Sequence, residues 1–209
     1  MAKYSGPKCK LCRRAGEKLF LRGERCESSK CAMVKRNYPP GMHGQKGQVR
    51  LTEFGTQLKE KQKAKKIYGL QERILHNYYL KAANSKGNNA ELMLQLLELR
   101  IDNLIYRAGF APSRAKARQL VNHGHFLIKG RRVNIPSYQV KINEIISVSE
   151  KKLATTNFQT VLKTIEKKEI PQWLKVDKQK LSCQLIAKPT LEDIKPPFAL
   201  NQIIEFYSR

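Results

Sequence analysis

The sequence predicts an α+β fold: a mostly helical first domain with an N-terminal metal loop of four cysteines, then a mixed α/β domain of two helices and a small sheet, then a C-terminal helix. Three observations carry this prediction. Apolar residues recur at helical spacing over much of residues 57–106, short apolar runs separated by turn residues follow residue 125, and four cysteines lie within the first 31 residues. At 209 residues and 41% hydrophobic residues, the chain is long enough to bury a core.

Residues 98–148 form the unit around which the rest is organised. We expect one amphipathic helix to run up to Gly109, where a left-handed glycine ends it. Ser113 is a good N-cap for a second helix over residues 113–122, and Gly124 ends that helix. The apolar face of the first helix consists of Leu92, Leu96, Leu99, Asn103 and Tyr106.

The rest of the chain alternates between weaker helical and strand signals. Its C-terminal helix, from Leu200 to Tyr207, is too short to be stable alone in water, so we expect it to dock on an earlier helix. Further helices are expected at residues 57–68, 71–83 and 155–168, and strands at residues 126–128, 133–135, 145–148 and 181–187. Residues 170–177 are expected to form a turn followed by a strand.

The charge of the chain predicts a polyanionic partner. There are 41 Lys and Arg against 17 Asp and Glu, a net charge of +24. Membranes are a weaker alternative, because no apolar run approaches the ~20 residues of a spanning helix. Nucleic acid is the favoured partner. The basic residues we expect at the interface are Arg13, Arg14, Arg22, Arg36, His43, Lys46, Lys59, Lys61, Lys65, Arg114, Lys116, Arg118, His123, His125, Lys129 and Arg131.

The cysteines predict a metal site. The N-terminus is polar and carries no secretory signal, so we expect a reducing compartment in which thiols serve as metal ligands rather than disulfides. Their spacing suits a closed, structural Zn²⁺ site, with an iron-sulfur cluster as the alternative and a redox pair less favoured. The four ligands would be Cys9, Cys12, Cys26 and Cys31, while Cys183 reads as a packed side chain.

Several motifs, spread over almost the whole chain, resemble those of one known family. Tyr38-Pro39-Pro40-Gly41 precedes His43-Gly44, Ser113-Arg114 opens the second helix, and the sequence closes on Glu205-Phe206-Tyr207-Ser208-Arg209. With the four cysteines and the segment from Leu97 to Tyr138, these motifs resemble the family of bacterial small-subunit ribosomal protein four. Two departures are Cys183, where Gly is expected, and Gln202, where Glu is usual.

The resemblance implies a fold, a function and partners. It implies a helical domain that the C-terminal helix rejoins, and an α/β domain built on an RNA-binding module. The implied function is a structural one in the cytoplasm: early binding to a multi-helix junction in the 5′ domain of 16S rRNA, which nucleates assembly of the subunit body. Contact with small-subunit protein five would affect translational accuracy, and protein three would lie nearby at the mRNA entry. No membrane or small-molecule substrate is implied. The expected division is residues 1–50, residues 51–97 completed by 198–209, and residues 98–197 containing the module 98–162.

The alternative to a binding protein is an enzyme that acts on RNA. The same module is appended to RNA-modifying enzymes, and Arg100-Ile101-Asp102 is similar to the Arg-Leu-Asp catalytic motif of pseudouridine synthases. However, Asp102 falls inside the module, where it can pair with a neighbouring Arg, and no catalytic domain remains outside it. A stand-alone RNA chaperone is a nearer alternative, but such proteins lack the cysteine cluster and the helical first domain. We therefore expect a binding protein and not an enzyme.

Overall fold

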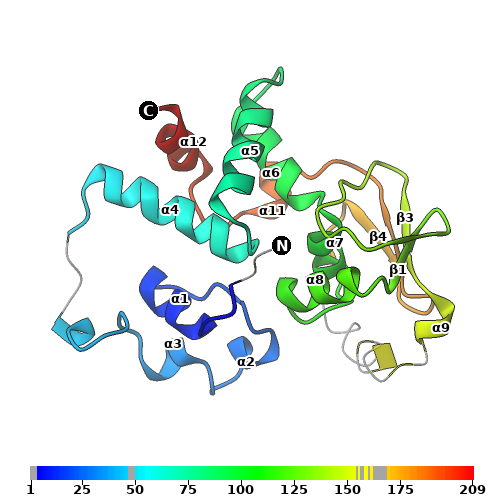
Figure 1. The fold of residues 1–209 in the computed structure, drawn as a ribbon, viewed down its shortest axis with the longest axis horizontal. Coiled ribbons are helices and arrows are strands. Elements are labelled where there is room, and N and C mark those ends of the chain that lie inside the picture. Colours follow the sequence, from blue (N-terminus) through cyan, green and yellow to red (C-terminus); the bar gives the residue numbers. More distant parts are fainter. Residues whose placement is uncertain (1–3, 47–49, 154, 156–157, 160, 162–168) are drawn as a thin grey trace. The chain divides into compact units, whose positions relative to one another are not determined.

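The structure is a computed structural model that describes residues 4–46, 50–153, 155, 158–159, 161 and 169–209. The chain divides into two compact units, residues 1–93 with 196–209 and residues 94–195 (Figure 1). In the described part of the chain, no helix has both the length and the apolar character needed to cross a membrane.

The first unit is helical. Three short helices, α1 (Lys8–Ala15), α2 (Glu24–Glu27) and α3 (Ala32–Lys35), surround the cysteines, and a 3-10 turn, η1 (Gly44–Lys46), follows the Pro/Gly segment. The long helices are α4 (Glu53–Ile67) and α5 (Glu72–Ala83). Thr52 begins α4 because its side chain accepts a hydrogen bond from the Gly55 N–H.

The C-terminal helix α12 (Leu200–Ser208) packs on α4, which confirms that it returns to the first domain. Phe206 lies 5.4 Å from Phe54 of α4 between ring centroids, and the Ala199 N–H donates to Glu60 Oε2 at 2.9 Å. Packing on α4 supplies the stability that a nine-residue helix lacks by itself.

The second unit begins with the helices α6 (Asn89–Glu98), which crosses the boundary between the units, α7 (Ile101–Arg107) and α8 (Arg114–Asn122). Three sequence predictions are confirmed here. Gly109 has a φ of 87° and Gly124 a φ of 64°, and Ser113 caps α8 by accepting a hydrogen bond from the Lys116 N–H.

The single helix expected up to Gly109 is wrong, because the chain breaks between α6 and α7. Arg100 has extended backbone there and forms a β-bridge with Gln139, while the Ile101 N–H donates to the Tyr138 carbonyl at 2.9 Å. Backbone pairing with a segment about 40 residues away therefore interrupts a pattern that is helical in the sequence.

Among the residues that the structure describes, five antiparallel strands form one sheet in the order β2-β1-β3-β5-β4. The second strand begins at Arg131 rather than Val133, because the two-residue Lys129-Gly130 turn places Arg131 opposite Ile128. A helix at residues 155–168 was also expected, and most of that segment lies outside the described residues. The strands are β1 (Phe126–Ile128), β2 (Arg131–Val133), β3 (Ile145–Val148), β4 (Leu174–Asp177) and β5 (Ser182–Leu185). Two further short helices of this unit are α9 (Glu150–Leu153) and α11 (Leu191–Ile194).

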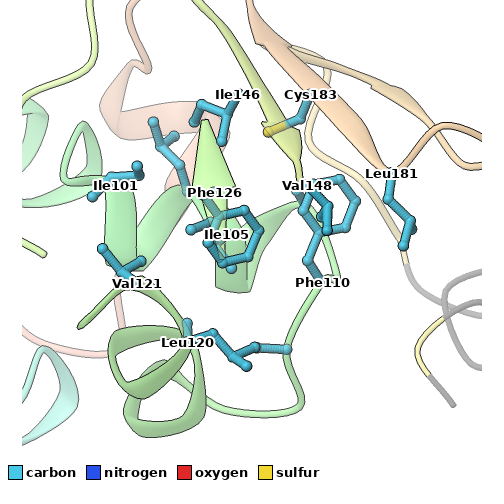
Figure 2. Packing of buried hydrophobic residues seen from close by; sticks show 14 of the residues in the cluster. Ile101, Ile105, Phe110, Leu120, Val121, Phe126, Ile146, Val148, Leu181 and Cys183 are labelled. Carbon is cyan, nitrogen blue, oxygen red and sulfur yellow. The ribbon is translucent and has the colours of Figure 1, made fainter. Parts of the chain in front are cut away.

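The core of the second unit lies between α7, α8 and the sheet. Figure 2 shows Ile105, Leu120 and Phe126 among the side chains that fill it. Phe126 is fully buried and packs at 6.5 Å from Phe110 and 6.1 Å from Phe158, measured between ring centroids. Cys183 lies in this core, as expected of a packed side chain, and burial raises the pKa of its thiol to about 12. The core thus fixes α8 and the β1–β2 hairpin, which carry the basic residues Arg114, Lys116, Arg118, Lys129, Arg131 and Arg132.

Candidate nucleic-acid interface

The second unit presents a cluster of positive charge around His125, at the end of α8. Burial lowers the pKa of His125, and the positive charges of Lys152, His123, Arg132 and Lys116 lower it further. The His123 and His125 rings lie 5.9 Å apart, and His125 Nδ1 is buried without a hydrogen-bond partner among the described residues. Cations from α8, β2 and α9 thus converge on one histidine, an arrangement that suits a phosphate.

Gly124 and Arg132 fit together at the edge of this cluster. Arg132 Nη2 donates to the His123 carbonyl at 2.7 Å, and its Nε would lie 2.0 Å from a Cβ added to Gly124. The glycine therefore ends α8 and also makes room for the guanidinium. Lys152 of α9, which was not among the interface residues expected from the sequence, also belongs to the cluster. Its position depends on tertiary contacts that a motif does not reveal.

Arg114 of α8 was expected at the interface, and the structure places it in a network inside the unit. Its Nε donates to Asn103 Oδ1 at 2.7 Å, and its guanidinium lies 4.5 Å from the Tyr106 ring centroid. Both residues belong to α7, so Arg114 joins α8 to α7.

Glu98 is the centre of that network and is fully buried. It accepts hydrogen bonds from Arg107 Nε at 3.0 Å and Nη2 at 2.9 Å and from Asn103 Nδ2 at 2.6 Å, while Arg114 Nη2 lies 3.9 Å away. The carboxylate thus holds α6, α7 and α8 together.

The remaining expected residues of this unit differ in exposure. Lys129 and Arg131 are exposed on the β1–β2 hairpin, where Lys129 Nζ pairs with buried Glu144 at 3.1 Å. Lys116 and Arg118 are half-buried on α8. The motif Arg100-Ile101-Asp102 is structural here, because Arg100 and Asp102 form a buried ion pair at 2.7 Å.

In the first unit, two of the lysines expected at the interface make ion pairs within the protein. Lys61 is 6% exposed, and its Nζ lies 2.6 Å from Glu72 Oε1 and 4.2 Å from the Phe206 ring centroid. Lys65 Nζ pairs with the other oxygen of Glu72 at 3.0 Å. Lys61 therefore helps to hold α12 on α4 and has almost no surface to offer RNA. Lys59, the third of these lysines, is half-buried on α4.

Glu72 is strongly stabilised as a carboxylate. Burial alone would raise its pKa, but hydrogen bonds from Lys61, Tyr207 and Lys65 lower it to about 2. The Tyr207 hydroxyl donates at 2.7 Å. Burial and the Glu72 carboxylate in turn raise the pKa of Tyr207.

Most of the basic residues around the cysteines and the Pro/Gly segment are exposed. Of the residues expected at the interface, the exposed side chains here are Arg14, Arg22, Arg36, His43 and Lys46. Arg13 differs, because its guanidinium donates to the carbonyls of Tyr38 and Pro39 at 2.9 and 3.2 Å. The exposed set gives the first unit a basic surface of its own, of the kind that suits phosphate contacts.

The four N-terminal cysteines line one pocket, together with Lys8, Arg22 and Arg25. Burial and the neighbouring thiols raise the pKa of Cys12, against a hydrogen bond from the Leu19 backbone that lowers it. Within the described ranges, no three His, Cys, Asp or Glu side chains are grouped closely enough to hold a metal ion.

Comparison with known proteins identifies the family. Residues 3–98 match the family described as "Ribosomal protein S4/S9 N-terminal domain", and residues 99–146 match the "S4 domain". Similar proteins include "Small ribosomal subunit protein uS4" from Caldicellulosiruptor bescii, 49% identical, and from Acetivibrio thermocellus, 47% identical. "Small ribosomal subunit protein uS4A" from Clostridium acetobutylicum is 47% identical. Each alignment spans 209 residues and the full length of both chains. This chain belongs to the family of small ribosomal subunit protein uS4.

Proposed function

We propose that this chain is a primary binder of 16S rRNA, which binds a multi-helix junction in the 5′ domain early and nucleates assembly of the subunit body. As a member of a ribosomal protein family, the chain is a structural, rRNA-binding component of the small subunit in the cytoplasm and not an enzyme. The observation that carries the proposal is the cation cluster around His125, and all of its residues except Lys152 lie within the matched S4 domain.

Two units with separate basic surfaces suit a junction of RNA helices. Such a junction is recognised through phosphates, 2′-hydroxyl groups and shape rather than through sequence. A protein that binds the folded junction more tightly than its alternatives shifts the RNA population toward the folded form. This differential affinity is how binding would nucleate assembly.

The test is competition binding of small-subunit rRNA against large-subunit rRNA of equal length, across a salt titration. We expect a preference for small-subunit rRNA that persists at high salt, with protection at a junction in the 5′ domain. Equal affinities that fall together as salt rises would contradict the proposal, because phosphate contacts alone give that result.

A contact with small-subunit protein five, and with protein three near the mRNA entry, extends this proposal. The support is the resemblance of the chain to its family over its whole length. Cross-linking of assembled subunits would test the contacts, and stop-codon readthrough in cells with surface variants of this protein would test the effect on accuracy. Unchanged readthrough in every variant that loses the cross-links would contradict it.

A structural Zn²⁺ ion on Cys9, Cys12, Cys26 and Cys31 is also proposed, with an iron-sulfur cluster as the alternative. Four unpaired thiols in one pocket are a donor set that suits either group, and Lys8, Arg22 and Arg25 offset its negative charge. We expect one zinc per chain by elemental analysis, and removal by a chelator to unfold residues 8–35 while the second unit stays folded. A visible absorption band with iron and sulfide would instead identify the cluster.

A further inference from the structure

Arg13 holds the loop of residues 38–46 against α1. Its Nε donates to the Tyr38 carbonyl at 2.9 Å, its Nη2 donates to the Pro39 carbonyl at 3.2 Å, and its guanidinium lies 4.7 Å from the Tyr38 ring centroid. One side chain thus forms two hydrogen bonds and a cation–π contact with consecutive residues. The planar guanidinium thus binds the protein backbone, and the Arg13 side chain is half-buried.

We call the contacts of Arg13 with Tyr38 and Pro39 the clamp, and further contacts make the loop compact. Gly44 packs so closely that an added Cβ would lie 1.9 Å from the Pro39 carbonyl oxygen, the same atom that accepts from Arg13. The Gly44 N–H donates to the Gly41 carbonyl at 3.2 Å, and the Lys46 N–H donates to the His43 carbonyl at 3.1 Å. The loop thus folds back on Pro39, and Arg13 fixes the point on which it folds.

Several side chains of this loop are exposed to solvent. Met42 is 94% exposed, and His43 and Lys46 are exposed beside it. Exposed side chains on a backbone that is held by a clamp are preorganised for binding, because less conformational entropy is lost when a partner binds.

We propose that Arg13 is a positioning residue, which fixes the loop of residues 38–46 so that His43 and Lys46 meet rRNA in one geometry. It does not itself contact phosphate. The inference rests on the proposed rRNA binding and gives one of the expected interface residues a different role. Without the clamp, the loop reaches its binding geometry in only a fraction of molecules, and the apparent affinity falls by that fraction.

The test compares Arg13 with Arg14, the next residue of α1, whose side chain is exposed. We expect Arg13→Ala and Arg13→Lys both to weaken binding of small-subunit rRNA about tenfold, because lysine cannot form the two-carbonyl contact. The slope of log K against log salt stays that of the wild type in both. Tyr38→Leu, which keeps both carbonyls, weakens binding about threefold. Arg14→Ala lowers the slope by about one if it meets a phosphate, and Arg14→Lys restores it.

A second measurement examines the loop in the full-length protein without RNA. Hydrogen exchange of the Gly44 and Lys46 amides should become faster in both Arg13 variants and in Tyr38→Leu, while the α4 amides of these variants keep their wild-type rates. In the Arg14 variants, the Gly44 and Lys46 amides should also exchange at wild-type rates. This readout stands even if the wild type shows no preference for small-subunit rRNA, an outcome that would remove the proposed function but not the clamp.

Two results would overturn the inference. If Arg13→Lys binds like the wild type and Arg13→Ala lowers the salt slope by about one, then Arg13 is a phosphate contact. If loop exchange is unchanged in both Arg13 variants, then Arg13 does not hold the loop.

Discussion

The buried carboxylate of Glu98 provides the sharpest test of how the second unit is held together. Glu98→Gln keeps the size of the side chain but removes the charge that faces Arg107 and Arg114. Breaking a buried ion pair by changing one partner costs about 3–5 kcal/mol, because the other charge is left without compensation. Arg107 is 25% exposed and can regain some water, so we expect the lower end, about 3 kcal/mol.

Urea unfolding followed by tryptophan fluorescence measures this change in the right unit. Trp173 is the only tryptophan of the chain and is 4% exposed in the core of the second unit. The matched control is Glu169→Gln, an exposed carboxylate in the same unit, which should stay within about 0.5 kcal/mol of the wild type.

A double-mutant cycle with Arg107→Gln isolates the pair, and we expect a coupling energy above about 1 kcal/mol. A loss of stability below about 1 kcal/mol in Glu98→Gln, together with no coupling, would refute the reasoning. It would mean that the burial of the carboxylate cancels everything that its hydrogen bonds contribute.

Four further outcomes follow from the described contacts. Tyr207→Phe should cost about 1 kcal/mol by removing the hydroxyl that bonds Glu72. Because the pKa of Glu72 is lowered to about 2, its carboxylate contributes fully to folding stability above pH ~4.5, and this contribution is lost as the pH falls toward 2. In an acid titration followed by circular dichroism, Tyr207→Phe should therefore unfold at a higher pH than the wild type. Phe126→Ala should cost about 3–5 kcal/mol in urea unfolding, whereas a cost below about 1 kcal/mol would contradict the packing of the core. Arg131→Ala should lower the salt slope of rRNA binding by about one without changing stability. His125 has a lowered pKa that a nearby phosphate would raise, so rRNA affinity should increase as the pH falls from about 7.5 to about 6, and His125→Gln should remove that increase.

Local signals in the sequence predicted much of the fold. Ser113 caps α8, Gly109 and Gly124 take left-handed conformations, and the Lys129-Gly130 turn joins two strands. Each of these depends on the intrinsic preference of one or two residues, so no tertiary information is needed to predict it.

The errors arise where distant residues decide the outcome. The helix expected to run up to Gly109 breaks at Arg100, because the backbone there pairs with Gln139 and the side chain with Asp102. Spacing predicts which residues share a helical face, but it does not reveal a backbone partner about 40 residues away.

The same reason limits the prediction of the interface. Charge identifies Lys61 and Arg13 as candidates, but one is buried against Glu72 and the other bonds two backbone carbonyls. Composition counts cations without saying which of them the protein uses internally. Arg36, His43 and Arg131 remain exposed and stay as predicted contacts.

The packing of α12 on α4 has a consequence for the order in which the chain folds during synthesis. The first unit needs residues 196–209, and these leave the translating ribosome after all of residues 94–195. All residues of the second unit are synthesised before Phe206 and Tyr207, so this unit can fold before those two side chains pack on α4 and α5. The unit that is synthesised first is therefore completed last, and its apolar face stays exposed for the time that translation of about 100 residues takes, on the order of 5–20 seconds.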